Sequence, residues 1–170
     1  MAGLLKKFCD SDYRLPARRG RFTVGLLKPW EVRHVARLEA ESFPEPLSPA
    51  ALLRLWLRPE TTYLAVRDGG KLAAYIGFQA WGPLAHTISM CVAKEYRRQG
   101  LGRLVQLVAN KVAMQQGLRC FCGEVRISNT PQLQLLRAMG WREAGRFATF
   151  FGNGEDAVLV YYLLESDRGD

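Results

Sequence analysis

Apolar residues follow two different spacings along the chain. Runs rich in β-branched and aromatic residues predict strands at 22–27, 61–66, 72–81, 87–92 and 118–127, and a final hairpin from 141–151 and 157–164. Apolar residues spaced three or four apart predict helices at 29–42, 48–57, 101–115 and 130–139. The order of these elements, β-α-α-β-β-β-α-β-α-β-β, predicts a mixed α/β sheet with helices on both faces.

The length of the chain fits one domain. With 170 residues, 48% of them hydrophobic, it can bury an ordinary core without disulfides or metal. We expect the domain to span residues 22–165, after a basic N-terminal extension at 1–21 and before a tail at 166–170. No apolar run approaches the roughly 20 residues that span a bilayer, and residues 1–7 lack the pattern of a signal peptide. The sequence therefore predicts a cytoplasmic protein that does not bind a membrane.

Four cysteines, Cys9, Cys91, Cys120 and Cys122, bear on both metal binding and compartment. Cys120 and Cys122 lie two apart in a predicted strand, so their side chains share a face. A metal site built on them needs further His or Cys ligands, and the chain has only two histidines. We therefore expect no metal, and reduced core thiols that fit a reducing cytoplasm.

Half of the net charge of +8 lies at the N-terminus, where residues 1–22 contain six basic and two acidic side chains. One interpretation is an arm that contacts a ribosome or nucleic acid, or that attracts anionic ligands. The other is a solvated, partly disordered leader. No basic motif interleaved with aromatic residues, as in RNA-binding modules, accompanies these charges.

The stretch from Met90 to Arg103 contains the most informative motif. A predicted strand ends, a basic turn with glycines at Gly100 and Gly102 follows, and a helix begins. The first N–H groups of a helix lack internal partners and lie at the positive end of its dipole, so they can bind an anion. Glycine lets a phosphate approach the backbone closely. The turn therefore suits a pyrophosphate, although the same spacing also occurs in surface turns whose glycines cap a helix.

Two stretches of sequence carry a family resemblance. The run Tyr96–Gly102 resembles the acetyl-CoA loop of the GNAT superfamily of N-acetyltransferases. Residues Glu124–Asn129 and Leu135–Trp141 resemble the family's E-V-R-x-S-N and L-Y-x-x-x-G-F segments. Residues 41–48 and 154–160 resemble the branch that acetylates the N-terminal alanine of ribosomal proteins. The resemblance covers roughly residues 22–164.

The resemblance implies a GNAT fold, in which a mixed sheet of about seven strands has helices on both faces and two central parallel strands splay apart to bind acetyl-CoA. Backbone groups of Met90, Cys91 and Val92 would pair with the pantetheine arm, and the Val92 N–H would polarise the thioester carbonyl. Asn129 would form a hydrogen bond with the cofactor. The residues implied for the pyrophosphate are Arg97, Arg98, Gln99, Gly100, Leu101, Gly102 and Arg103.

The resemblance also implies catalytic and acceptor-binding residues. Glu124 occupies the position of the general base in the branch that acetylates N-terminal alanine, and His86 is a second candidate base. Each has a plainer interpretation: Glu124 as the partner of an arginine such as Arg126, and His86 as an ordinary polar residue at a strand end. The acceptor pocket would be formed by two loops that include Phe43, Glu45, Phe150 and Phe151.

One position departs from the family pattern. Leu136 stands where the family often has a tyrosine that acts as general acid. Since thiol pKa values are near 8.5, a CoA thiolate can leave unprotonated, and Tyr161, Tyr162 or water are alternative donors. A second consequence of Leu136 would be a domain that binds acetyl-CoA without turnover.

The sequence thus predicts an acetyl-CoA-dependent N-acetyltransferase whose acceptor is the α-amino group of a protein or peptide N-terminus. The amine would attack the thioester directly. Alternatives that remain are a small-molecule amine acetyltransferase acting on a polyamine or aminoglycoside, an aminoacyl-tRNA acetylating enzyme, and a non-catalytic acetyl-CoA-binding or ribosome-associated module. A net charge of +8 disfavours polycationic acceptors.

Overall fold

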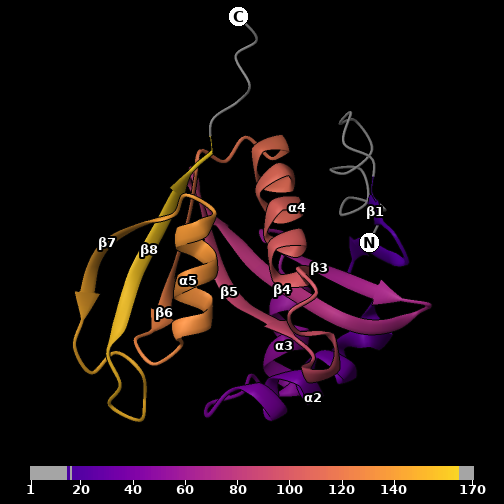
Figure 1. Ribbon diagram of the computed structural model, residues 1–170, viewed down its shortest axis with the longest axis horizontal. Helices are drawn as coiled ribbons and strands as arrows, with labels where there is room; N and C mark the ends of the chain where they lie inside the picture. The colour runs from indigo at the N-terminus through magenta and orange to yellow at the C-terminus, as the bar shows by residue number, and fades with distance from the viewer. Residues whose placement is uncertain (1–14, 16, 165–170) are drawn as a thin grey trace, which may run out of the picture.

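A single mixed sheet organises the molecule (Figure 1). The computed structural model describes residue 15 and residues 17–164. Within these residues the sheet has eight strands in the order β1-β2-β3-β4-β5-β6-β8-β7, and only the β5–β6 pair is parallel. The strands are β1 (Ala17–Arg19), β2 (Phe22–Leu26), β3 (Thr61–Asp68), β4 (Lys71–Trp81), β5 (Leu84–Val92), β6 (Cys120–Arg126), β7 (Arg142–Phe147) and β8 (Ala157–Leu163).

The helices begin where the sequence provides caps. Ser48 caps α3 by accepting a hydrogen bond from the Ala51 N–H at 3.2 Å, and Asn129 caps α5 by accepting one from the Gln132 N–H at 3.3 Å. Both helices carry a proline in their first turn, where its missing N–H costs nothing. The helices are α2 (Val32–Ser42), α3 (Pro49–Trp56), α4 (Leu101–Gln115) and α5 (Thr130–Ala138), with short 3-10 turns η1 (Pro29–Glu31) and η2 (Lys94–Tyr96).

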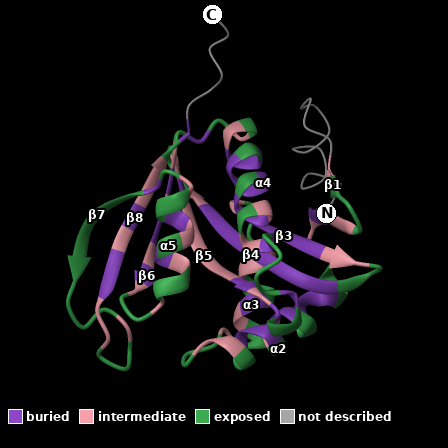
Figure 2. Ribbon diagram, viewed as in Figure 1, coloured by how far each residue is buried: buried purple, intermediate pink, exposed green. Residues whose placement is uncertain are grey.

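Helices cover both faces of the sheet, as the sequence predicted. In the view of Figure 1, α4 and α5 lie in front of the sheet and α2 and α3 behind it. The middle of β4 is therefore buried on both faces, with Tyr75, Ile76 and Phe78 fully inaccessible (Figure 2). No helix among the described residues is long and apolar enough to cross a membrane.

The eighth strand was not expected from the sequence. Strand β1 has only three residues, too few for an alternation of apolar and polar positions to be recognised, and it pairs antiparallel with β2. It lies within the segment 1–21 that the sequence suggested as an N-terminal extension. The remainder of that segment, apart from residue 15 and residues 20–21, lies outside the described residues, as does the tail at 166–170.

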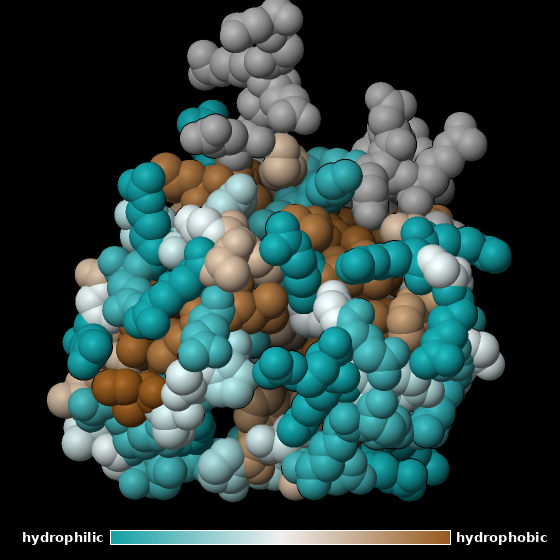
Figure 3. Space-filling view, viewed as in Figure 1, coloured by the Kyte–Doolittle hydropathy of each residue, from teal (hydrophilic) through white to brown (hydrophobic). Residues whose placement is uncertain are grey.

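The two parallel strands separate soon after they meet. Their pairing covers Leu84–His86 of β5 and Cys120–Cys122 of β6, after which β5 continues to Val92 without a partner on that side. The antiparallel pairing of β5 with β4 shifts register between Gly77 and Phe78, which leaves Ile88 as the extra residue of a bulge. In the space-filling view the face with α4 and α5 is hollowed, and hydrophilic side chains border the hollow (Figure 3).

Candidate active site

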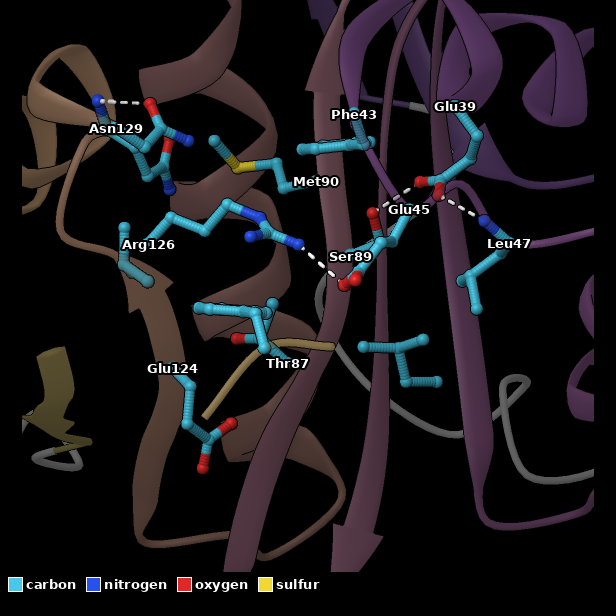
Figure 4. A pocket seen from close by; sticks show the side chains of 14 residues that line it. Glu39, Phe43, Glu45, Leu47, Thr87, Ser89, Met90, Glu124, Arg126 and Asn129 are labelled. Atoms are coloured by element: carbon cyan, nitrogen blue, oxygen red, sulfur yellow. Dashed lines mark hydrogen bonds and ion pairs between the residues drawn. The ribbon is translucent and has the colours of Figure 1, made fainter. Parts of the chain in front are cut away.

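A pocket of about 220 Å³ lies in the opening between β5 and β6 (Figure 4). One wall is β5 and the other is β6 with the first turn of α5, while the end of α2, the loop to α3 and the β7–β8 turn close the outer side. The residues that line it are Glu39, Phe43, Glu45, Leu47, Thr87, Ile88, Ser89, Met90, Glu124, Val125, Arg126, Asn129, Gln132 and Phe151.

The predicted base Glu124 is paired with the other candidate base. His86 lies directly opposite Cys122 in the parallel pairing, and Glu124 is two residues further on the same face of β6. The His86 Nε2 atom is 2.8 Å from Glu124 Oε2. Because an ionised carboxylate only accepts hydrogen bonds, Nε2 carries the proton and donates it. This hydrogen bond lowers the pKa of Glu124 in spite of partial burial, so the carboxylate is ionised at neutral pH.

Arg126 connects the two loops that close the pocket. Its guanidinium is 2.8 Å from Glu45 Oε2 in the α2–α3 loop and 3.0 Å from Glu155 Oε2 in the β7–β8 turn. It also lies 3.8 Å from the ring centroid of Phe151. Hydrogen bonds from Ser128, and then from Arg126, lower the pKa of Glu155 to about 2. Arg126 is therefore the partner of Glu45 and Glu155, and not of Glu124.

A buried carboxylate joins the α2–α3 loop to β5. Glu39 is 2% exposed, and its Oε2 accepts a hydrogen bond from the Leu47 N–H at 2.8 Å. Its Oε1 accepts hydrogen bonds from the hydroxyls of Ser89 and Tyr75. Burial raises the pKa of Glu39 above its ordinary value. Glu39 therefore shapes the pocket wall by holding the Leu47 backbone and the Ser89 side chain in place.

The basic turn has the geometry of an anion cradle. Helix α4 begins without a side-chain cap, after Arg98 and Gly100 with φ of 62° and 77°. This positive φ suits Gly100, since it has no Cβ to clash with the backbone. Arg97 Nε donates to the Val92 carbonyl at 3.1 Å, which fixes the turn to the end of β5. Arg19 of β1 brings a further positive charge, because its guanidinium is 3.5 Å from the place that a Cβ on Gly100 would occupy.

Successive backbone N–H groups along β5 point to opposite edges of the strand, so the three residues implied for the pantetheine arm do not all face the opening. The Ala93 N–H donates to the Ala73 carbonyl of β4 at 2.9 Å, so the Val92 N–H points to the opposite edge, into the opening. By the same alternation the Met90 N–H faces the opening and the Cys91 N–H faces β4. The Cys91 thiol is buried 3.1 Å from the Ser42 hydroxyl.

The pocket brings six of the sequence-derived site residues together. Glu124, Met90, Asn129, Phe43, Glu45 and Phe151 line the pocket, whereas His86 lies behind Glu124 and outside the lining. Phe150 is 48% exposed and packs against Phe147 and Phe151 beside the pocket. Gly102 has a packing role as well, because a Cβ there would approach Leu135 Cδ2 at 3.0 Å.

Neither tyrosine considered as a general acid lines this pocket. Leu136 itself is 3% exposed, within the core. Tyr162 stacks on Trp141, and Tyr161 lies opposite Cys122 and does not reach the pocket.

Three features of the site were missed by sequence reasoning. These are the bridging role of Arg126, the buried Glu39 and the stacking of Trp81 on His86. Arg126 stands within the motif E-V-R-x-S-N, which is a local signal that could have identified it. Glu39 and Trp81 had none, since their roles depend on contacts between distant segments.

Comparison with known proteins agrees with this geometry. The chain is 29% identical over 136 residues to a putative [ribosomal protein bS18]-alanine N-acetyltransferase of Bacillus subtilis, covering 79% of this chain and 90% of that protein. It is 30% identical over 137 residues to an uncharacterized N-acetyltransferase of Methanocaldococcus jannaschii, covering 79% and 87%. The crystal structure of the ribosomal-protein-S18-alanine N-acetyltransferase from Escherichia coli superposes with a TM-score of 0.78 at 22% identity, covering 88% and 97%.

Among the described residues the sheet opens at its one parallel pair, with a glycine-containing turn at one end of the opening and a carboxylate within it. This architecture is of the α/β class. Residues 31–141, more than half of the chain, match the acetyltransferase (GNAT) family. The chain belongs to this family and is an N-acetyltransferase.

Proposed function

We propose that this enzyme transfers the acetyl group of acetyl-CoA to the α-amino group of a protein or peptide N-terminus. The observation that carries the proposal is the position of Glu124. Its carboxylate lines the pocket in the opening between β5 and β6, hydrogen-bonded to His86, while the α2–α3 loop and the β7–β8 turn cover the outer side. A chain end that enters between these loops meets the carboxylate at the inner end of the pocket.

Residues on both sides of the opening fit acetyl-CoA, which when bound supplies an activated acetyl thioester. The uncapped start of α4 and the turn residues from Arg97 to Arg103 would hold the pyrophosphate, with Arg19 adding charge. The N–H groups of Met90 and Val92 face the opening, where they would pair with the pantetheine arm and the thioester carbonyl. Asn129 lines the pocket, and its side-chain NH₂ group remains available for the cofactor.

The acid–base properties of Glu124 favour an α-amine. The hydrogen bond from His86 lowers the pKa of Glu124, so this carboxylate is a weak base at neutral pH. An α-amino group has a pKa of about 8 and a lysine side chain one of about 10.4. Roughly a tenth of α-amines, but far fewer than a thousandth of lysines, are neutral at pH 7. A weak base therefore suffices for an N-terminus.

The residues of the site account for each proton and electron pair. The α-amine attacks in its neutral form, and its nitrogen lone pair forms the new N–C bond at the thioester carbonyl carbon. Glu124 takes the proton that this nitrogen loses as the bond forms. The Val92 N–H donates to that carbonyl oxygen. The C–S bond breaks and its electron pair remains on sulfur, where a thiol pKa near 8.5 makes a dedicated general acid unnecessary.

The acceptor we propose is a protein N-terminus, by analogy with the relative named as a ribosomal protein bS18-alanine N-acetyltransferase. A ribosomal acceptor would also give the positive charges of the N-terminal segment a polyanionic surface to contact. We place this activity in the cytoplasm, where thiols such as those of Cys91, Cys120 and Cys122 stay reduced.

The test is to incubate the enzyme with acetyl-CoA and a panel of peptides that differ at their first residue. N-blocked peptides containing lysine and a set of polyamines serve as alternative acceptors. CoA release is measured and each product is confirmed by mass. Acetylation confined to free α-amines is expected, and it would name the preferred first residue.

Two results would overturn the proposal. Faster acetylation of polyamines or lysine side chains than of any N-terminus would reassign the acceptor. Tight binding of acetyl-CoA without turnover on any acceptor would indicate a binding module and make Leu136 the decisive departure from the family.

A further inference from the structure

Trp81, at the end of β4, stacks on the partner of Glu124. The ring centroids of Trp81 and His86 are 4.1 Å apart and their planes differ by only 6°. The pairing of β4 with β5 places Gln79 opposite His86 and Trp81 two residues further on the same face. Trp81, His86 and Glu124 thus form a diagonal row across three neighbouring strands.

The orientation of Trp81 is fixed from its other side by polar contacts. Its indole Nε1 donates to Gln79 Oε1 at 3.1 Å, and Gln79 Nε2 donates to Glu60 Oε1 at 3.1 Å. Because Glu60 accepts the amide NH₂ group, Gln79 presents its carbonyl oxygen to the indole. These two hydrogen bonds therefore orient the Trp81 ring independently of its contact with His86.

Burial does not explain this arrangement. The Trp81 residue is 51% exposed, so about half of its surface stays in contact with water. Nevertheless it lies nearly parallel to His86, a geometry that fixes the plane of the imidazole ring. In that orientation Nε2 is 2.8 Å from Glu124 Oε2.

We propose that Trp81 is a positioning residue that holds the imidazole of His86 in the plane from which it binds Glu124, and so fixes the carboxylate in the pocket. This inference rests on the proposed role of Glu124 as the base. As a positioning residue, Trp81 acts only through His86 and makes no contact with the acceptor.

The surroundings of His86 contain few other groups that titrate. On β6 these are Glu124 and Cys122, and burial is the main cause that raises the pKa of the Cys122 thiol to about 11, so it stays neutral at pH 7. On β4 the facing residues are Gln79 and Trp81, neither of which titrates. Tyr161 lies one strand beyond, opposite Cys122. A change in pH dependence after a change at Trp81 would therefore report on the His86–Glu124 pair.

The first test uses the free enzyme and NMR. The chain has only two histidines, His34 and His86, so their ring protons are easily told apart. His34 is exposed on α2 and serves as the internal reference. We expect the His86 ring protons to resonate upfield because of the indole ring current. In Trp81→Ala they should move toward the position of His34, while Trp81→Phe should retain a smaller upfield shift.

The second test is a double-mutant cycle on turnover of the best peptide. Trp81→Ala should lower kcat by about tenfold, since displacement of a catalytic group by about 1 Å can cost up to about 10²-fold. The KM for acetyl-CoA should not change, and Trp81→Phe should restore most of the rate. In a His86→Ala background, Trp81→Ala should have no further effect. The matched control is Trp30→Ala, which changes another exposed tryptophan. The contact of Trp30 is with the Lys28 ammonium, which lies over its ring.

The pH profile provides a third readout. Since the hydrogen bond from His86 is the main cause that lowers the pKa of Glu124, its loss in Trp81→Ala should raise that pKa. Activity that requires ionised Glu124 would then be lost at a higher pH than in the wild type. Additive effects of Trp81→Ala and His86→Ala, or unchanged His86 resonances, would overturn the proposal. Absence of turnover in the wild type would instead contradict the proposed function, while the NMR result would still stand.

Discussion

Glu124 is subject to two opposing effects on its pKa. Partial burial favours the neutral acid, whereas the hydrogen bond from His86 favours the carboxylate, and the hydrogen bond is the larger effect. The pair therefore keeps the carboxylate ionised at neutral pH and holds it in one orientation. A carboxylate held in this way takes the proton that the neutral amine loses as its new N–C bond forms.

The change Glu124→Gln tests this role directly. It should lower kcat/KM by about 10²-fold or more, the usual contribution of a general base, without changing acetyl-CoA affinity. In the wild type, kcat/KM should rise through pH 7–8 with deprotonation of the acceptor α-amine. Loss of activity through protonation of Glu124 should appear only below its ordinary pKa of 4.5, because its pKa is lowered.

Peptide turnover and isothermal titration with CoA measure these two quantities. Glu143→Gln, at a carboxylate paired with Arg137 outside the pocket, is the matched control. A Glu124→Gln enzyme with full activity on a confirmed peptide would contradict the assignment of the base.

The position of a candidate site residue in the pocket was predictable from sequence where a family motif contained it. Glu124 and Asn129 belong to a short run between a strand and a helix that resembles such a motif, and both line the pocket. Trp81 was not predictable as a site residue. Its contact with His86 depends on the register of β4 and β5, including a bulge at Ile88 that shifts the pairing, and no local pattern encodes that shift.

At the scale of elements, the β7–β8 turn and the α2–α3 loop are joined through a side chain of β6. Arg126 binds Glu45 on one side and Glu155 on the other, and the ring of Phe151 packs on its guanidinium. Gly152 allows the approach of the two loops, because a Cβ there would be 2.6 Å from Glu45 Oε1. The outer part of the pocket is therefore held by one cation with two carboxylates.

Replacement of Arg126 should weaken binding of the acceptor peptide and leave binding of acetyl-CoA unchanged. We expect Arg126→Met, which keeps an apolar stem over Phe151, to raise the KM for the peptide by about tenfold, the loss of roughly one hydrogen bond to a charged group. Acetyl-CoA affinity should not change. Arg146→Met on the exposed strand β7 is the matched control. Equal effects on peptide KM and on CoA binding would show that Arg126 stabilises the whole site and not the acceptor loops.

The pairing of β3 with β4 requires a glycine at one position. Gly77 lies directly opposite Tyr63, and a Cβ on Gly77 would be 2.2 Å from the Tyr63 ring. The ring cannot move away easily, because Tyr63 is 4% exposed within the core. Such overpacking typically costs about 1–3 kcal/mol.

We therefore expect Gly77→Ala to lower the free energy of unfolding by that amount and Tm by about 2–12 °C, measured by calorimetry. Gly145→Ala in β7 is the control, since a Cβ at Gly145 has no neighbour within 4 Å and should leave Tm nearly unchanged. Equal Tm values for the two variants would mean that the Tyr63 ring can adjust.

The elements themselves were largely predictable from sequence, and the exceptions have physical causes. Ser48-Pro49 and Thr130-Pro131 marked the starts of α3 and α5, because prolines and caps act locally at a helix start. The cap formed by Asn129 was not predicted. The strand predicted for 141–151 ends at Phe147, since the residues that follow form the turn that reaches Glu45 and Arg126. Strand β1 could not be predicted because three residues carry no pattern.

At the scale of the whole molecule, the sheet consists of two halves that are joined by a short strand pairing. Strands β1–β5 form one antiparallel half and β6, β8 and β7 form the other. Within the part of the chain that the structure describes, the only strand pairing between the halves is Leu84–His86 with Cys120–Cys122. Beyond this joint the β5 N–H groups of Met90 and Val92 have no strand partner. The opening between β5 and β6 was predicted from the family resemblance alone. No local sequence pattern indicates where the pairing of two parallel strands ends.

A ligand that fills the opening should therefore stabilise the molecule as a whole. Acetyl-CoA at about 100 times its Kd should add about 2.7 kcal/mol to the free energy of unfolding, which corresponds to a rise in Tm of about 5–11 °C. Hydrogen exchange should slow at the amides of Met90 and Val92. Adenosine 3′,5′-bisphosphate, which lacks the pantetheine arm, is the control: it should raise Tm less and leave these two amides unprotected. Equal protection by both ligands would mean that binding at the turn before α4 closes the two halves on its own, and that the opening between β5 and β6 is not where the thioester arm lies.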